Sequence, residues 1–345
     1  MNKMRLFLAL FAIGCGAQPH VANAQSIDVM GTRAAGMAGA FVGVADDASA
    51  AYWNPGGLAA GSYFSLVLDG GAERAAPEQS LRGRKQSAYF LGATIPALGL
   101  TYYRLQRSFA TPYELLVPAD GAVSSRNLTG AAPVRLDSLV THHAGVTLVQ
   151  SVLPNVAVGA TVKLVRGIAA SEPLGFVSAD EALDQEDVRG RATNKFDVDV
   201  GVMATVRGFK AGLAVRNLRA PEFSVPDGAG TLKLERQARA GVSYAVTASW
   251  LVAADLDLLE MSDAFGDRRD VAFGVEGRLA RRVTVRSGLR LNAAGSAADE
   301  VDAGDRAFAL GGSFAATASV LIDAAALRGG DRNGRGWRVG ARFVY

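Results

Sequence analysis

The chain contains little of the chemistry that enzymes and metal sites use most often. Its 345 residues include one cysteine, Cys15, and three histidines. Cys15 lies in the first 24 residues, which have the pattern of a secretion signal. A mature chain without cysteine excludes disulfides, thiol catalysis and zinc held by cysteine. Only His142 and His143 remain after the signal, and this excludes a histidine-rich metal site.

Other shortages narrow the class of protein further. Proline is scarce, at 11 residues, and no stretch after the signal reaches the roughly 18 consecutive apolar residues of a membrane-spanning helix. The formal charge is only +3, and the basic residues are spread along the chain rather than clustered, so nucleic-acid binding is not expected. By contrast, glycine is abundant, at 40 residues, and 49% of the residues are apolar, which argues against disorder.

The N-terminus predicts export. Lys3 and Arg5 precede a short apolar run over residues 6–14, and Ala22-Asn23-Ala24 is a small-x-small cleavage site. We therefore expect a signal peptide over residues 1–24. Lipoprotein processing at Cys15 remains an alternative, because Gly14 is a suitable small residue before it.

After residue 60 the dominant period is two. Between Val283 and Asn292, one face is mostly apolar and the other carries Thr284, Arg286 and Arg290. Because successive side chains of a strand point to opposite faces, such segments are two-faced strands. A soluble sandwich and a membrane barrel both produce this alternation, with opposite faces toward water.

The connections distinguish the two folds. We expect about fourteen strands, and the connections between them alternate between short and long. Thr247 alone joins two strands in this prediction, and Ala316-Thr317 forms a near-direct turn. Alternation of this kind is typical of an outer-membrane up-and-down barrel, which has tight periplasmic turns and long outer loops. We therefore predict an all-β fold, a transmembrane antiparallel β-barrel over residues 62–345, with strands near 62–70, 86–95, 98–106, 137–151, 155–167, 195–206, 209–217, 233–246, 248–259, 270–280, 283–292, 306–316, 317–326 and 335–345.

The last strand ends in aromatic residues. Trp337, Phe343 and Tyr345 share one face, and Tyr345 is the final residue. This arrangement is typical of an interfacial aromatic girdle. We also interpret it as the C-terminal signal through which the barrel assembly machinery would bind the strand.

If the apolar faces meet lipid, the opposite faces line the lumen. A charged side chain facing lipid at mid-depth costs about 2–4 kcal/mol, so the charged faces are expected inside. Asp255 and Asp257 share a face, as paired catalytic carboxylates would, but no histidine, serine or cysteine partner is visible, and we expect no enzyme. The predicted lumen-lining residues are Lys163, Asp197, Asp199, Asp255, Asp257, Arg286, Arg290, Arg338 and Arg342, with Glu276 and Arg278 on the same faces.

Residues 25–61 do not alternate and are rich in small residues. Asp46 and Asp47 precede a short Ala-rich stretch, where they would cap a helix or pair with arginines of the lumen. Tyr52-Trp53 would either stack an apolar ligand or pack against the barrel wall, and Asn54-Pro55 begins a turn. We expect this compact segment to be a plug, or hatch, inside the barrel.

The same stretch resembles the hatch of the FadL family of outer-membrane channels, also called OmpP1/TodX. The residues that carry the resemblance are Gly36, Gly39, Ala45-Asp46-Asp47-Ala48 and Asn54-Pro55. Tyr52-Trp53-Asn54-Pro55 is even more similar to the PorV and PorQ relatives of that family.

The resemblance implies a function. FadL proteins pass fatty acids or hydrocarbons across the outer membrane by diffusion, gated by the hatch, with a side opening near an inward kink of the third strand. It therefore implies an outer-membrane channel in contact with membrane lipid, with a hydrophobic small molecule as ligand. The alternative is a PorV-like barrel that binds a secreted or surface protein. We expect no cofactor and no metal, because the acidic run of Asp299, Glu300, Asp302 and Asp305 lacks the spacing of a calcium loop.

Overall fold

The computed structural model describes residues 29–77, 80–95, 97–113, 133–185, 190–226, 230–263, 266–294, 306–329 and 334–345. The predicted signal peptide, Cys15 and the acidic run from Asp299 to Asp305 lie outside these residues. Within them, no helix is long and apolar enough to cross a membrane.

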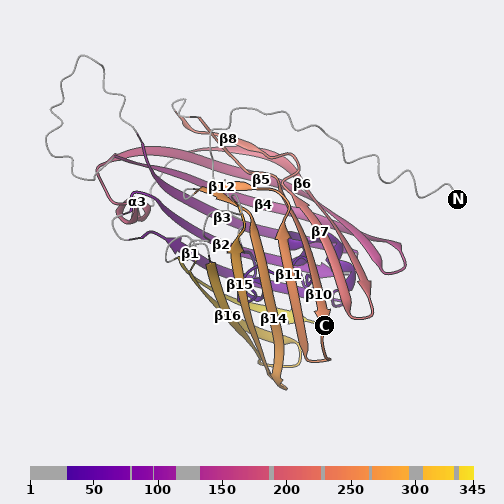
Figure 1. Ribbon diagram of the computed structural model, residues 1–345. Coiled ribbons are helices and arrows are strands. Elements are labelled where there is room, and N and C mark those ends of the chain that lie inside the picture. Colours follow the sequence, from indigo (N-terminus) through magenta and orange to yellow (C-terminus); the bar gives the residue numbers. More distant parts are fainter. Residues whose placement is uncertain are drawn as a thin grey trace, which may run out of the picture.

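The described residues form a closed barrel of fourteen antiparallel strands (Figure 1). Each strand pairs with the barrel strands before and after it, and the first pairs with the last from Ser65 to Arg74, which closes the sheet. This confirms the predicted up-and-down barrel. The strands are β1 (Ser65–Ala75), β2 (Gly83–Ile95), β3 (Leu98–Pro112), β4 (Val134–Leu153), β5 (Val156–Gly175), β6 (Arg191–Val206), β7 (Phe209–Arg216), β10 (Gln237–Ala245), β11 (Trp250–Asp257), β14 (Asp270–Ala280), β15 (Val283–Asn292), β16 (Arg306–Ala315), β17 (Val320–Gly329) and β18 (Arg335–Val344).

The two faces of the wall have opposite chemistry. On β5, Val162 is 55% exposed, whereas its neighbour Lys163 is 1% exposed. Leu310 and Phe196 are likewise exposed, although they are large and apolar. The apolar faces therefore point outward and the charged faces point inward, which is the reverse of a soluble sandwich.

The tight turns lie at one end of the barrel, together with the start of the first strand and the end of the last strand. Phe64 and Tyr345 exchange backbone hydrogen bonds of 3.0 and 2.9 Å there. Two of the predicted turns were too short. The chain turns over residues 246–249 and 316–319, and in each turn a threonine hydroxyl, of Thr247 or Thr317, accepts two backbone N–H groups.

The other end carries the long connections. These contain the helix α3 (Ala179–Asp184) and two hairpins, β8–β9 (Glu222–Ser224 and Thr231–Lys233) and β12–β13 (Met261–Asp263 and Gly266–Arg268). The pattern of alternation predicted none of them. β3, β4 and β5 also run several residues further toward this end than predicted, because backbone pairing continues after the apolar alternation has stopped.

Residues 29–61, here called the inner segment, fill the barrel. They form the short helices α1 (Thr32–Gly36) and α2 (Ala50–Trp53) and the 3₁₀ helix η1 (Pro55–Ala60). Most of their side chains are fully buried, and they touch wall strands on every side of the lumen, from β2 around to β18. The domain division at residue 61 itself stays a prediction.

Wall glycines allow the inner segment to lie this close. A Cβ added at Gly212 of β7 would come within 2.6 Å of the carbonyl oxygen of Val42, and one at Gly241 of β10 within 2.7 Å of the backbone nitrogen of Gly43. Such distances leave no space for a side chain. Glycines of β5, β6, β14, β15 and β16 meet the inner segment in the same way, namely Gly159, Gly201, Gly274, Gly288 and Gly311.

We predict that Gly159→Ala loosens the inner segment without unfolding the barrel. Its Cβ would overlap the backbone of Pro55, and overpacking of this kind costs roughly 1–3 kcal/mol. Limited proteolysis of the folded protein should then cleave the inner segment faster. The control is Gly312→Ala, because a Cβ at Gly312 meets nothing closer than 3.4 Å. Equal protease resistance of the two variants would contradict the prediction.

Candidate functional site

The hatch motif residues hold the inner segment in shape and against the wall. Gly36 lies against Gly311, and Gly39 ends the first turn of the segment with φ +88°, a left-handed conformation that favours glycine. Asn54 is fully buried and donates to the carbonyl oxygens of Val42, at 3.1 Å, and Val202, at 3.0 Å. Its own oxygen accepts from Gly56 N–H at the start of η1, which Pro55 opens.

Asp46 and Asp47 do not cap a helix. Ser49 precedes α2 and makes no capping bond, while Asp47 accepts from the backbone and hydroxyl of Ser49 instead. Asp46 pairs with Arg33, at 2.5 Å, and with Lys210 of β7, at 3.1 Å. Of the two alternatives, pairing with an arginine is therefore the one that the structure bears out for Asp46, while Asp47 accepts the Ser49 N–H at 2.9 Å and lies 3.4 Å from Arg33.

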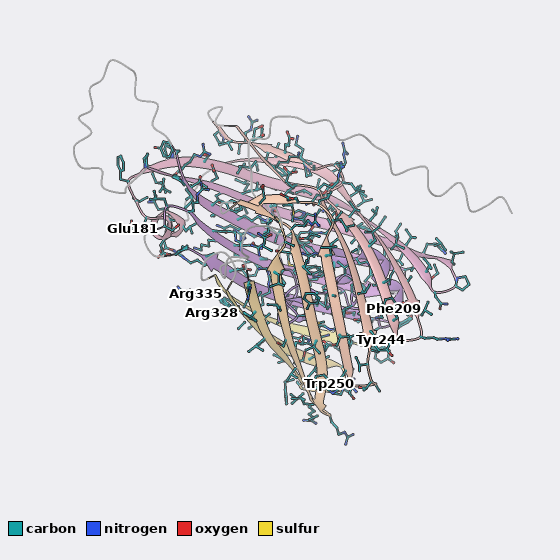
Figure 2. The ribbon with its side chains drawn as sticks, in the orientation of Figure 1. Glu181, Phe209, Tyr244, Trp250, Arg328 and Arg335 are labelled. Atoms are coloured by element: carbon teal, nitrogen blue, oxygen red, sulfur yellow. The ribbon has the colours of Figure 1, made fainter. Side chains whose placement is uncertain are left out.

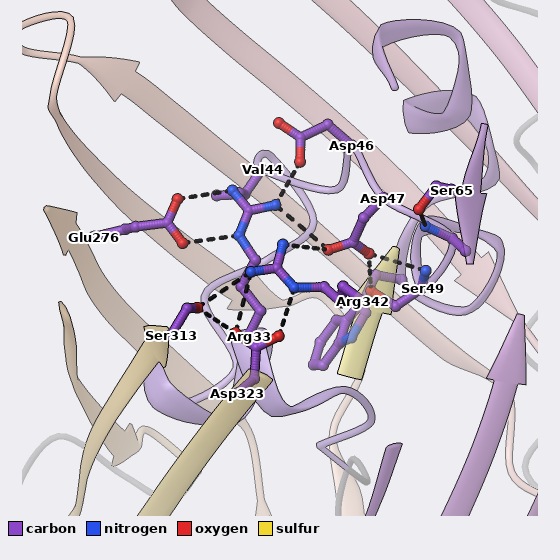
Figure 3. Close-up of polar contacts among 12 residues, drawn as sticks. Arg33, Val44, Asp46, Asp47, Ser49, Ser65, Glu276, Ser313, Asp323 and Arg342 are labelled. Carbon is purple, nitrogen blue, oxygen red and sulfur yellow. Dashed lines mark hydrogen bonds and ion pairs between the residues drawn. The ribbon is translucent and has the colours of Figure 1, made fainter. Parts of the chain in front are cut away.

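Arg33 is the centre of an ion network that joins the inner segment to the wall. Its guanidinium forms a bidentate pair with Glu276 of β14, with both N–O distances at 2.8 Å, and also contacts Asp46 and Asp47 (Figure 3). Glu276 accepts from Arg286 of β15 at 2.6 Å. The sharing of one carboxylate by two arginines extends the network from the segment across the wall.

The network closes through Asp323 of β17. Asp323 pairs with Arg342 of β18, at 2.6 Å, and with Arg286, at 3.3 Å, and Arg342 lies 3.8 Å from Asp47. Four cations and four carboxylates therefore balance, which limits the cost of removing them from water. The eight residues are Arg33, Lys210, Arg286, Arg342, Asp46, Asp47, Glu276 and Asp323.

The network lies toward the tight-turn end of the lumen. Lys210 and Arg342 stand close to strand ends at the tight turns, and the side chain of Asp46 is 27% exposed. Burial by itself would raise the pKa of Asp46, but Arg33 and Lys210 outweigh it and lower that pKa below its usual range. Asp46 therefore stays charged at neutral pH and keeps the network paired.

A second polar group holds the middle of the inner segment. The carboxylate of Asp255 accepts the backbone N–H groups of Phe41, at 2.9 Å, and Val42, at 2.8 Å. Asp257 pairs with Arg239 at 2.6 Å, and Arg239 also donates to the carbonyl of Gly39. The two carboxylates thus fasten the segment to the wall, and this use accounts for their shared face without an acid–base reaction.

A third group lies on the other side of the inner segment, near the loop end. Lys163 is fully buried and pairs with Asp199, at 2.7 Å, and Asp197, at 3.1 Å. The rings of Tyr103 and His143 stack beside it with centroids 4.2 Å apart, and Tyr52 meets Tyr103 edge to face at 5.5 Å. Aromatic and charged side chains therefore share this part of the lumen.

The nine predicted lumen residues all lie on inward faces, but they do not form one site. They divide among the groups above, apart from Arg338, which pairs with Asp69 at 2.8 Å, and Arg290, whose nearest carboxylates stand 3.6 and 3.7 Å away. Arg278 is exposed at the rim. Arg33, Lys210, Arg239 and Asp323 were not among the predicted site residues.

Two signals in the sequence would have found some of these residues. Arg33 is the one basic residue between positions 29 and 61, and Asp323 is the one charged residue of the predicted strand over residues 317–326. A single charge in either setting needs a partner when it is buried. Which residue supplies that partner depends on closure of the barrel.

The aromatic residues of the last strand face outward. Trp337, Phe343 and Tyr345 are all on the outer face, and Phe343 meets Phe64 edge to face at 5.9 Å. His142 and His143 point to opposite faces, as their adjacency predicts. Among the described residues, no group of three or more histidine, cysteine, aspartate or glutamate side chains is placed to hold a metal ion.

One family model matches part of the chain. It is described as "F plasmid transfer operon, TraF, protein" and matches residues 89–257. No curated protein matches the sequence.

Solved structures match nearly the whole chain in fold. A Pseudomonas aeruginosa FadL homologue is 11% identical with a TM-score of 0.59, covering 93% of this chain and 99% of that one. The CymD monoaromatic hydrocarbon channel is 11% identical with a TM-score of 0.60, covering 90% and 96%. The Pseudomonas putida toluene transporter TodX is 13% identical with a TM-score of 0.56, covering 93% and 98%. These likenesses show that the chain has the same barrel fold as the FadL and TodX channels. The closer similarity to PorV and PorQ stays a prediction.

We predict that Glu276→Gln loosens the inner segment at the tight-turn end. Removing one partner of a buried ion pair destabilises a protein by roughly 3–5 kcal/mol. We expect a loss of about 2 kcal/mol here, because Arg33 still pairs with Asp46 and Asp47. Planar-bilayer recordings should show more frequent openings than the unaltered protein.

The matched control is Arg74→Gln. It removes a charge from an outer-face pair with Asp180 and Asp184, whose side chains are 62% and 63% exposed. Exposed pairs contribute about 0–1 kcal/mol, so openings should not change. If the Glu276 variant conducts like the control, the network does not hold the inner segment in place.

Proposed function

We propose that this chain is an outer-membrane channel through which small hydrophobic molecules diffuse, with the inner segment as its hatch. An apolar outer face and a paired, charged interior suit a barrel surrounded by lipid. The likeness in fold to hydrocarbon channels and to a toluene transporter supports the same reading. The proposal assigns no cofactor and no reaction to the barrel.

The observation that carries the proposal is a pair of apolar clusters on one side of the lumen. At the loop end, Phe223 of the β8–β9 hairpin packs on Leu139 and Val165, which face inward from β4 and β5. This cluster was missed in the sequence, because its members come from short, separated segments. A hydrophobic molecule entering between the loops would meet an apolar surface there once the hairpin moves aside.

A second, separate apolar cluster lies against the inner segment. Tyr103, Leu105 and Phe90 of β2 and β3 belong to the same buried cluster as Tyr52 and Trp53. The Tyr52–Tyr103 contact joins wall and segment directly. The wall residues of the ion network around Arg33 come from β7, β14, β15, β17 and β18, whereas Lys163 with its two aspartates lies beside Tyr103.

Release would differ from the route that the family resemblance implies. β3 pairs residue by residue with β2 and with β4 along its length, without a shift in register. A side opening at a kink of this strand therefore finds no support. We place the exit at the tight-turn end instead, where the ion network meets solvent at Asp46 and Lys210.

A second candidate is a barrel that binds a protein partner, as the PorV-like alternative suggests. It is favoured by the polar interior, by the unbroken third strand and by a matching family model named for a plasmid transfer operon. In that case the inner segment would be a permanent plug, and the elaborated loops with α3 and β8–β9 would form the binding surface.

The two candidates predict different uptake. In a host that lacks such a channel, cells with the folded full chain should take up labelled toluene or a labelled fatty acid faster than cells without it. Tyr103→Ala should slow uptake about fivefold, because an aromatic pair contributes about 1 kcal/mol. The control, Tyr244→Ala, removes an exposed aromatic from the outer face and should leave uptake unchanged.

The outcome decides between the candidates. If the barrel is folded in the outer membrane, as its heat-modifiable gel mobility would report, and uptake does not exceed the background, the channel is excluded. A stoichiometric partner protein retained on gentle purification would then favour the second candidate.

A further inference from the structure

On the outer wall, basic residues lie toward the loop end of the apolar face. Seven neighbouring strands, from β17 through β18 and β1 to β5, each carry an outward basic side chain in their loop-side half. Figure 2 shows two of them, Arg328 and Arg335, at this end of the wall, with Phe209, Tyr244 and Trp250 at the other. The seven residues are Arg328, Arg335, Arg74, Lys85, Arg104, His142 and Arg166.

Three of these residues stand side by side. Arg104 on β3 lies directly opposite His142 on β4, and His142 lies directly opposite Arg166 on β5. Basic groups placed opposite each other on a sheet repel when they are charged, and they destabilise it. An anion lying over the three side chains would offset this repulsion.

The protein itself does not supply that anion. Within the part of the chain that the structure describes, no ion pair joins Arg104 or Arg166 to a carboxylate. Arg104 donates to the side-chain oxygen of Gln106 at 2.9 Å, and Nδ1 of His142 lies 2.7 Å from the hydroxyl of Tyr102. Gln106 and Tyr102 are both neutral. Within the described residues, the guanidinium charges of Arg104 and Arg166 are therefore not offset by a carboxylate.

An apolar groove lies next to this cluster on the same outer face. Its volume is about 540 Å³, and its floor is low because Gly70, at an outward position of β1, carries no side chain. Tyr89 and Tyr102 form one side of it, and Tyr89 lies directly opposite Arg104. The other outward side chains along it are Leu68, Leu91, Val339 and Ala341.

We propose that the groove and the basic cluster together bind one lipid with a phosphate-bearing head group from the loop-side leaflet. An acyl chain lies in the groove, and the phosphate lies against Arg104 and Arg166, whose planar guanidinium groups match phosphate oxygens bidentately. Charge complementarity selects this occupant, because a neutral lipid leaves the cations unpaired and a free anion leaves the groove unused.

The site faces lipid and not the lumen, so it does not depend on the proposed channel. A barrel that fails the uptake test would still bind the lipid.

The test uses the full chain, folded in detergent micelles, and native mass spectrometry. The probes are bisphosphorylated lipid A and the same lipid with its phosphates removed. The unaltered protein should retain the phosphorylated lipid and lose the dephosphorylated one. Arg104→Gln with Arg166→Gln should weaken retention roughly thirtyfold, since each basic residue near an anionic head group contributes about tenfold at most and fivefold on average.

The matched control is Arg281→Gln with Arg282→Gln, which removes the same charge from a tight turn at the opposite end. This control should retain the lipid like the unaltered protein. Heat-modifiable gel mobility checks folding, and the single variants Arg104→Gln and Arg166→Gln replace the double variant if it does not fold.

Three results would overturn the proposal. One is equal retention of the phosphorylated and dephosphorylated lipids. Another is displacement of the lipid by excess inorganic phosphate, which would assign the cluster to a free anion. The third is an equal loss of bound lipid in the control variant, which would show that net charge alone accounts for the effect.

Discussion

Close contact between the backbone of the inner segment and the bare backbone of the wall is the constraint on which the structure depends. The lumen of a fourteen-strand barrel is wider than its own side chains can fill. A chain segment can fill it completely only where the wall has no side chains in the way, as at Gly159, Gly212 and Gly288. The high glycine content of the sequence is in part a consequence of this contact.

The contact also decides where charge is placed. The inner segment contributes one cation, Arg33, and two carboxylates, so the wall must supply the remaining partners. Glu276 and Arg342 do so at the tight-turn end, and Asp255 binds the segment's free backbone N–H groups. Because each of these charges is compensated inside, the barrel bears a polar lumen without a large cost of desolvation.

Neighbouring residues on one strand face different surroundings, the lumen on one side of the wall and the outer face on the other. Tyr103 and His143 stack inside the lumen, while Tyr102 and His142 meet on the outer face one residue away. The strand period of two makes this possible, because successive side chains point to opposite sides of the wall. The lumen-facing and outward-facing surfaces can therefore change independently, although they are encoded by adjacent positions.

Much of the fold depends on residues that are close together in the chain, and this part could be predicted from the sequence. Alternation of apolar and polar residues, the turn residues and the aromatic end at Tyr345 depend on neighbours along the chain, so they predicted fourteen strands and their faces. α3 was also readable, since Ser178 and Glu181 form a capping box at its start. It was not predicted, because a search for alternation with a period of two does not detect a short helix.

The partnerships were decided only by the tertiary structure. Nothing in the sequence pairs Arg33 with Glu276, 243 positions away, or brings Gly70 beside Val339 to shape the groove. Both contacts appear only once β1 has met β18 and the barrel has closed around its inner segment. Closure is a property of the whole sheet, set by the register and number of all its strands, whereas a sequence pattern records only which way each residue faces.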